Sequence, residues 1–198
     1  GTEGTETTQQ EDEAPVEDGS ASIGEVTVTD DTTGDTETIT TEPEMQDTLG
    51  VADDTDLSYE NTAASNAIQQ AVDAALSYAD GNLEITSMTV VVDDGTYTGG
   101  LTIGRTHTVT TTDEATGETT TSEETYTLAE DFVLQIVASD APGDGGTLTN
   151  SAGGAGFDGT ITIDDMDVMI AGLYFVTTGV VNARSGSVTV YGTTQDDA

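Results

Sequence analysis

The sequence has no cysteine, no tryptophan and no lysine, and two arginines supply all of its permanent side-chain positive charge. Without cysteine there is no disulfide framework, so packing and hydrogen bonds alone must hold the fold. No apolar run approaches the roughly 18 to 20 residues of a membrane-spanning helix, which argues against membrane insertion. The chain begins at Gly1 without a signal peptide, and we expect it to be a mature protein or an excised module.

The charge of the chain is almost entirely of one sign. Acidic residues number 39, and the formal net charge is −37. Such a charge excludes nucleic acid and anionic membranes as partners. Cations, positively charged surfaces and neutral glycans stay compatible with it. Because 34% of its 198 residues are hydrophobic, the chain can build one narrow core but hardly two domains.

The composition divides the chain into three segments. Residues 1–20 hold a single strongly apolar side chain, Val16, and have the composition of an acidic extension or linker. Residues 21–60 contain β-branched runs and turn signals, which predict a leader of strands and hairpins. Residues 61–198 hold the helical pattern and the remaining strands, and we expect them to form the main domain.

The sequence contains two similar copies of one hairpin motif. VTVTDDTTGDTET at residues 26–38 and VTTTDEATGETTT at residues 109–121 align position by position without a gap. In each copy an Asp opens the turn, and Gly34 or Gly117 supplies the residue that can take a positive φ. The second copy lies within residues 104–128, which we expect to form an inserted hairpin.

Residues 61–80 carry the pattern of an amphipathic helix. Apolar side chains recur at helical spacing, at Ala64, Ile68, Ala71, Val72, Ala75, Leu76 and Ala79. Asn61 or Thr62 can cap its start, and Gly81 suits a left-handed residue after its end. The apolar stripe must cover something, and we expect it to close the N-terminal end of the main domain.

After this helix the hydrophobic period becomes two, in short runs at residues 89–92, 101–103, 132–137, 160–163, 168–170, 173–175 and 187–190. Leu134, Ile161 and Val188 are separated by two equal intervals in the sequence. A strand that recurs once per turn of a solenoid would produce such a spacing. We therefore expect these three side chains to stack in one internal ladder, with Thr160, Thr162 and Thr189 pointing outward.

Four segments resemble the opening coils of right-handed parallel β-helix proteins of the pectin-lyase-like type: AIQQAVDAALSYADG, MTVVVDDGTYTGGLTI, DFVLQIVASDA and MDVMIAGLYF. Asp94 to Tyr97 match the Asp-Gly-Thr-Tyr turn that follows the first buried strand in that family. The resemblance implies an all-β fold, a right-handed parallel β-helix closed at its N-terminal end by an amphipathic helix. The scarcity of Lys and Arg, with abundant Thr, Asp and Gly, is also similar to large secreted prokaryotic surface and adhesin repeat proteins.

Asp-rich turns are the candidate metal sites, because Ca²⁺ prefers hard oxygen ligands. We predict calcium at Asp93 and Asp94 and at the group Asp164, Asp165 and Asp167. Further candidates are Asp53, Asp54, Asp56, Asp140 and Asp144. None of them has EF-hand spacing, and a diffuse counterion cloud around the acidic chain is the alternative.

Catalysis is a weaker hypothesis. A lyase of the resembling family needs a basic residue to abstract a proton, and only Arg105, His107 and Arg184 could serve. A hydrolase needs convergent carboxylates, for which the Asp164 group is the best candidate. Surface decoration is the simpler interpretation of all these residues, and Arg184 would neutralise nearby carboxylates. Thr-x-Thr pairs also fit ice binding, although outward threonine is ordinary on a β face.

We therefore expect a non-enzymatic structural or adhesive module, secreted or on the cell surface, as one unit of a head-to-tail filament or tandem-repeat protein. The alternative is a carbohydrate-binding or polysaccharide-degrading β-helix. Its last coil would be open, and copies of the chain or adjacent modules would cover it end to end. Strands near residues 25–29 and 36–40 are expected to pair with the neighbouring module, and calcium or high salt to favour the contact.

Overall fold

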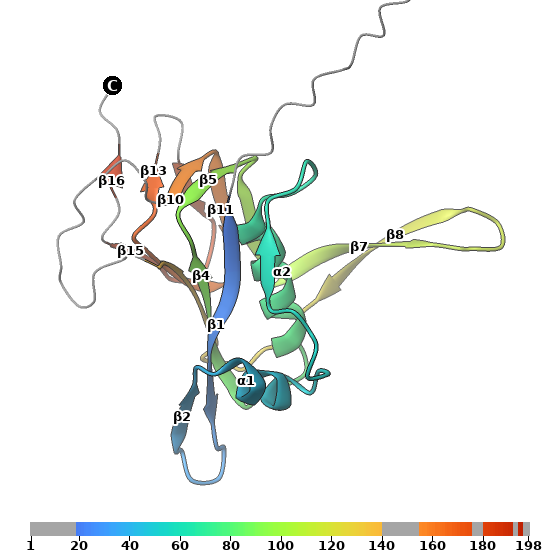
Figure 1. Cartoon of the computed structure of the whole chain (residues 1–198). Helices are drawn as coiled ribbons and strands as arrows, with labels where there is room; N and C mark the ends of the chain where they lie inside the picture. Colours follow the sequence, from blue (N-terminus) through green and yellow to red (C-terminus); the bar gives the residue numbers. More distant parts are fainter. Residues whose placement is uncertain (1–18, 140–154, 176–179, 192–193, 196–198) are drawn as a thin grey trace, which may run out of the picture.

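The computed structural model describes residues 19–139, 155–175, 180–191 and 194–195. Within them the fold is mostly β, with two helices, and its body consists of three sheets of stacked parallel strands (Figure 1). Sheet A contains β4 (Ile85–Val92), β9 (Val133–Ala138), β12 (Asp167–Ala171) and β15 (Val188–Tyr191); sheet B contains β5 (Gly95–Thr98), β10 (Ala155–Asp158), β13 (Tyr174–Phe175) and β16 (Thr194–Gln195); and sheet C contains β6 (Leu101–Gly104), β11 (Thr160–Asp164) and β14 (Val180–Ala183).

The chain visits these sheets in rotation, from A to B to C and back to A. We call each such passage a coil. Apolar side chains alternate with polar ones along the strands, as the period of two predicts, so each strand turns one row of side chains inward. Thr160 and Thr189 are exposed and Thr162 is half-buried, whereas Ile161 and Ile163 are buried between them, as predicted.

The core is built from ladders of inward side chains in successive coils. In sheet A, Met88, Leu134 and Val168 are neighbours and are buried. In sheet B, Phe157 lies beside Phe175, and the two rings meet edge to face with their centroids 6.0 Å apart. Edge-to-face packing is the arrangement that the ring quadrupoles favour.

The predicted ladder of Leu134, Ile161 and Val188 is wrong. Leu134 pairs with Val168, which pairs with Val188, whereas Ile161 lies in sheet C. The two coils between Leu134 and Val188 are unequal, because the chain from Leu134 to Val168 is much longer than the chain from Val168 to Val188. Ile161 lies midway between Leu134 and Val188 in the sequence, but it belongs to sheet C. The equal spacing of the three residues is therefore a coincidence and does not reflect a repeat of the structure.

The leader packs on the body of its own chain. β1 (Ser20–Thr29) adds antiparallel to β4 and extends sheet A, while β2 (Thr36–Ile39) and β3 (Ser58–Glu60) pair with β1. The expectation that residues 25–29 pair with a neighbouring module is therefore wrong, because both edges of that segment are used within the chain. Helix α1 (Glu42–Leu49) follows β2 and buries Met45 in the common core.

Helix α2 (Ala67–Ala79) covers the N-terminal end of the coils, where it contacts β1, β4 and β6. The predicted apolar stripe is buried from Ile68 to Ala79, but Ala64 is exposed and precedes the helix. The N-cap is Asn66, and not Asn61 or Thr62. Gly81 has a φ of 75°, as predicted. Neither helix of the described residues is long and apolar enough to cross a membrane.

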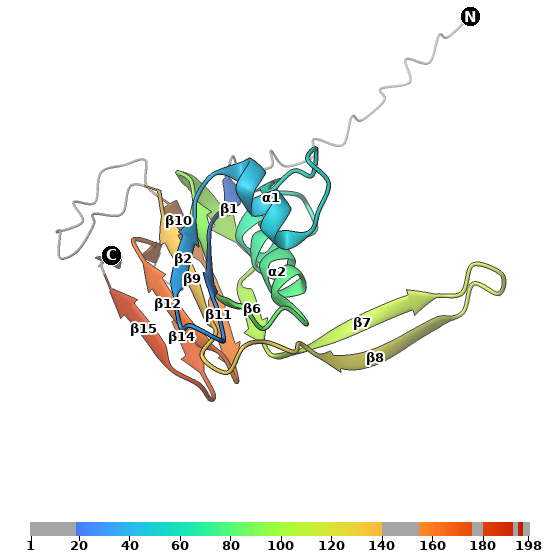
Figure 2. The ribbon, with the colours of Figure 1, turned by 90° about the horizontal axis from the view of Figure 1, so that it is seen from below.

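The inserted hairpin forms a two-stranded ribbon, β7 (Thr106–Thr112) and β8 (Thr119–Thr125), that projects from the body (Figure 2). Its turn repeats the turn between β1 and β2. The Oδ1 atom of Asp113 accepts from the Ala115 and Thr116 amides at 2.8 and 3.0 Å, and that of Asp30 accepts from two amides at 2.7 and 3.1 Å. These backbone hydrogen bonds lower the pKa of both carboxyl groups.

Candidate functional site

The predicted Asp164 group lies at the corner where the chain turns from sheet C back to sheet A. Asp164 ends β11 and Asp167 begins β12. Asp165, between them, has a φ of 53° and is the one non-glycine residue with a positive φ in the described part of the chain. Aspartate tolerates this conformation better than most residues, because its short side chain can form local hydrogen bonds.

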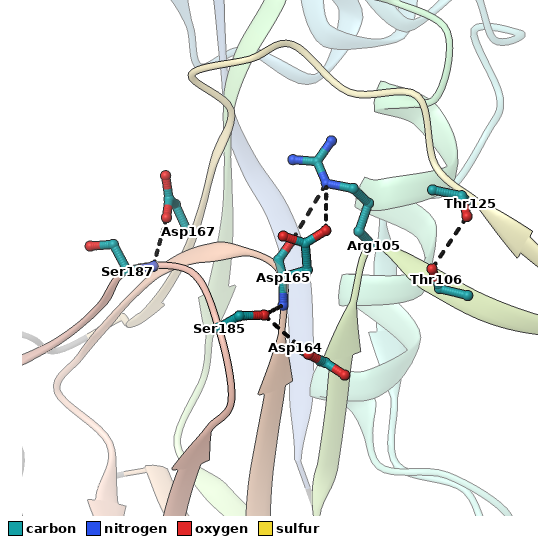
Figure 3. A network of polar contacts seen from close by, with 8 residues as sticks. All are labelled: Arg105, Thr106, Thr125, Asp164, Asp165, Asp167, Ser185 and Ser187. Carbon is teal, nitrogen blue, oxygen red and sulfur yellow. Dashed lines mark hydrogen bonds and ion pairs between the residues drawn. The ribbon is translucent and has the colours of Figure 1, made fainter.

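The carboxylates of Asp164 and Asp167 bind the next coil (Figure 3). Ser185 Oγ donates to Asp164 Oδ1 at 3.2 Å and accepts from the Asp165 amide at 2.9 Å. Two residues further along the same turn, the Ser187 amide donates to Asp167 Oδ1 at 2.7 Å. Asp164 and Asp165 thus share the Ser185 hydroxyl, through a carboxylate and a backbone amide, while the Asp167 carboxylate binds the Ser187 amide. The corner is a seam between successive coils.

Arg105 joins the same corner from the preceding coil. Its Nε lies 3.7 Å from Asp165 Oδ2 and donates to the Asp165 carbonyl oxygen at 3.4 Å. Its amide also donates to the Asp164 carbonyl at 3.3 Å. Because the Asp165 side chain is largely exposed, the ion pair contributes at most about 1 kcal/mol. Its main effect is positional, since Arg105 stands directly before the ribbon.

The second predicted calcium pair lies at a different corner, between sheets A and B. Asp93 accepts from Ser20 Oγ at 2.9 Å, and Asp94 is exposed in the turn before β5. The structure therefore does not bring the two predicted groups together. Within the described ranges no three acidic or histidine side chains converge as metal ligands, so calcium binding stays a prediction. Asp140 and Asp144 lie outside the described residues.

The three basic residues considered for catalysis are dispersed. Arg105 binds the corner, whereas His107 stacks on Tyr126 with ring centroids 3.9 Å apart and planes 10° from parallel. The Nδ1 atom of His107 is buried and finds no hydrogen-bond partner among the described residues. Arg184 is exposed in the turn between β14 and β15. In the described part of the chain it forms no ion pair, so its predicted neutralising role belongs instead to Arg105.

Sequence reasoning missed a set of amide side chains that cover the N-terminal edges of the sheets. Asn61 Nδ2 donates to the Thr96 carbonyl of sheet B at 2.9 Å. Asn66 Nδ2 donates to the Thr98 and Gly100 carbonyls at 2.8 and 2.9 Å, while its Oδ1 caps helix α2. The same residue therefore starts the helix and binds it to the first coil.

Gln69 covers the edge of sheet C in the manner of a strand. Its Nε2 donates to the Thr102 carbonyl at 3.0 Å, and its Oε1 accepts from the Thr102 amide at 2.7 Å. Sheet A needs no such amide, because β1 pairs along β4. The first coil is thus closed on all three sheets. The signal in the sequence was the three amides just before and within the helix, of which only Asn61 was considered, as a helix cap.

Comparisons of the chain with protein-family models, with curated proteins and with solved structures find no match.

Proposed function

We propose that this chain is a non-enzymatic structural or adhesive module, a right-handed parallel β-helix that stands outside the cell or on its surface and joins copies of itself or adjacent modules. The observation that carries the proposal is the difference between the two ends of the coil stack. One end is closed by α2, β1 and three amide side chains, whereas the strands at the other end have an unpaired edge among the described residues. Such an edge recruits further strands unless something covers it.

The open end is formed by β14, β15 and β16, which are the last strands of their sheets. Val190, in the ladder that contains Ile136 and Ile170, is 39% exposed there, while those two residues are fully buried. An apolar core that meets solvent at one end favours a partner that continues the same stack.

The surface chemistry supports a structural role. The body is held by internal ladders and by a corner seam in which the acidic side chains bind backbone and serine groups. The basic side chains are dispersed and do not face a common group of acids. A net charge of −37 without lysine keeps such a module soluble.

The experiment is to measure self-association by sedimentation velocity across a concentration series at physiological ionic strength. We expect the wild-type chain to associate and Val190→Lys to lose association, because an inward-pointing charge blocks a strand edge. The loss is diagnostic because the added lysine lowers the net repulsion between copies. Leu83→Lys is the matched control, since Leu83 is the other large exposed apolar side chain of the described residues, at 49%.

The control should associate like the wild type. A wild-type chain that stays monomeric up to millimolar concentration, or a Val190→Lys variant that associates equally well, would contradict the proposal.

A further inference from the structure

The ribbon β7–β8 has the geometry of an interaction arm. Its strands pair in register over seven residue pairs, from Thr106 with Thr125 to Thr112 with Thr119. The two strands form a sheet of their own, so both outer edges are unpaired in the described structure. The side chains beyond Val109 on β7 and all of those on β8 are exposed.

The direction of the ribbon relates it to the two ends of the coil stack. In Figures 1 and 2 the ribbon extends past α2, on the side of the closed end, whereas β15 lies on the opposite side of the body. When copies are arranged head to tail, the closed end of one faces the open end of the next. In such an arrangement the ribbon of the first copy points toward the last coil of the second.

The charges of the two surfaces are complementary. The charged residues of the ribbon and its turn are all acidic: Asp113, Glu114, Glu118, Glu123 and Glu124. His107, at the base, is the one other titratable residue. The open end carries Arg184, one of two arginines in the chain, exposed and without an ion pair in the described residues. In a molecule of charge −37, Arg184 is therefore the group at the open end that can attract the acidic ribbon.

We propose that the ribbon β7–β8 of one copy docks by strand addition on the open edge of β15 in a second copy, with its acidic turn region beside Arg184. This inference rests on the proposed function, which places the association at the open end, and it names the donor. A ribbon strand of seven residues is long enough to pair with all four residues of β15. Main-chain hydrogen bonds give affinity in this mode, while the side chains fix the register.

The twin hairpin between β1 and β2 supplies a matched control. Asp31 and Asp35 occupy the positions of Glu114 and Glu118 in the repeated turn, and all four side chains are exposed. However, β1 is paired with β4 and is thereby fixed to the body. The double variants Glu114→Lys/Glu118→Lys and Asp31→Lys/Asp35→Lys change the net charge by the same amount in the same local structure.

The test is sedimentation velocity on these variants, on Arg184→Glu and on a mixture. We expect Glu114→Lys/Glu118→Lys and Arg184→Glu each to lower the association constant at least about tenfold, because each brings like charges together. Asp31→Lys/Asp35→Lys should associate no more weakly than the wild type. An equimolar mixture of Arg184→Glu with Glu114→Lys/Glu118→Lys should recover association, since the reversed arm meets the reversed open end.

The outcomes separate this inference from the proposed function. If the wild type associates and Val190→Lys does not, but the ribbon variant behaves like the twin-hairpin variant, the open end is used and the ribbon is not its donor. If the mixture fails to recover association, the contact between arm and Arg184 is refuted. If the wild type does not associate at all, both proposals fail together.

Discussion

Two glycines meet where the chain turns from sheet B into sheet C in successive coils. A Cβ atom on Gly100 would lie 2.7 Å from the Thr160 carbonyl oxygen, and one on Gly159 would lie 2.7 Å from the Gly100 amide nitrogen. The two coils can therefore stack at this corner only because glycine, which has no Cβ atom, lets their backbones approach closely.

Gly100→Ala should destabilise the protein for two reasons, the positive φ and the collision, and a second glycine separates them. Gly81 has the same φ of 75°, but a Cβ there would meet nothing within 4 Å. We expect Gly81→Ala to cost about 1 to 2 kcal/mol for the left-handed backbone. Gly100→Ala should cost at least about 1 kcal/mol more because the corner must shift. Equal losses in urea denaturation would show that the corner yields to the methyl group.

The sequence predicted residues whose roles are local and missed those whose roles depend on distant partners. Gly34, Gly117 and the aspartates of both turns were predicted because the turn is specified within a few residues. The N-cap was not, because Asn61, the more obvious candidate, instead binds Thr96 and accepts from the Ala67 amide at 2.8 Å. Nothing in the local pattern distinguishes these asparagines.

At the scale of elements, α2 is a cap that forms hydrogen bonds with the first coil and also packs on it. Its apolar stripe was legible in the sequence because helical periodicity survives any tertiary arrangement. Its polar contacts were not, since Asn66 and Gln69 look like ordinary surface residues. They bind carbonyl and amide groups that would otherwise be an exposed sheet edge.

Asn66→Asp isolates the edge-covering role from the capping role. Aspartate is an equally good N-cap, so the helix start is preserved. The variant loses the two donated hydrogen bonds to Thr98 and Gly100 and leaves a carboxylate facing carbonyl oxygens in a buried position, where Asn66 is 7% exposed. We expect a loss of at least about 2 kcal/mol in the free energy of unfolding.

The control is Asn182→Asp, the same chemical change at an exposed position, which should alter stability by less than about 0.5 kcal/mol. If Asn66→Asp is as stable as the wild type by equilibrium denaturation, the amide contacts do not stabilise helix α2 on the first coil.

At the scale of the whole molecule, a mostly β fold with stacked parallel strands was predicted, and the register between the coils was not. Period-two runs and one amphipathic capping helix were visible in the sequence. The short coil from Val168 to Val188 shows the length of a coil without insertions, whereas the ribbon makes the coil from Met88 to Leu134 more than twice as long. Insertions at corners leave stacking intact and destroy the sequence period, so a regular interval is a poor guide to register between stacked parallel strands.

The order of coils is the claim on which the open end, the closed end and the ribbon all depend. The absence of cysteine makes it directly testable, because two introduced cysteines would be the only thiols. Gln135 and Met169 are lateral partners in sheet A, on half-buried outward positions. Thr162 lies in sheet C, at the same misleading sequence interval from Gln135 as Ile161 from Leu134.

The decisive measurement is therefore intramolecular disulfide formation under mild oxidation in two double variants, followed by mobility on a denaturing gel and by mass spectrometry. Lateral neighbours in a sheet lie within the Cα separation that a disulfide spans, roughly 4.4 to 6.8 Å. We expect Gln135→Cys/Met169→Cys to form the bond and Gln135→Cys/Thr162→Cys not to form it. A bond in the second variant and none in the first would contradict the coil order and, with it, the whole account of the two ends.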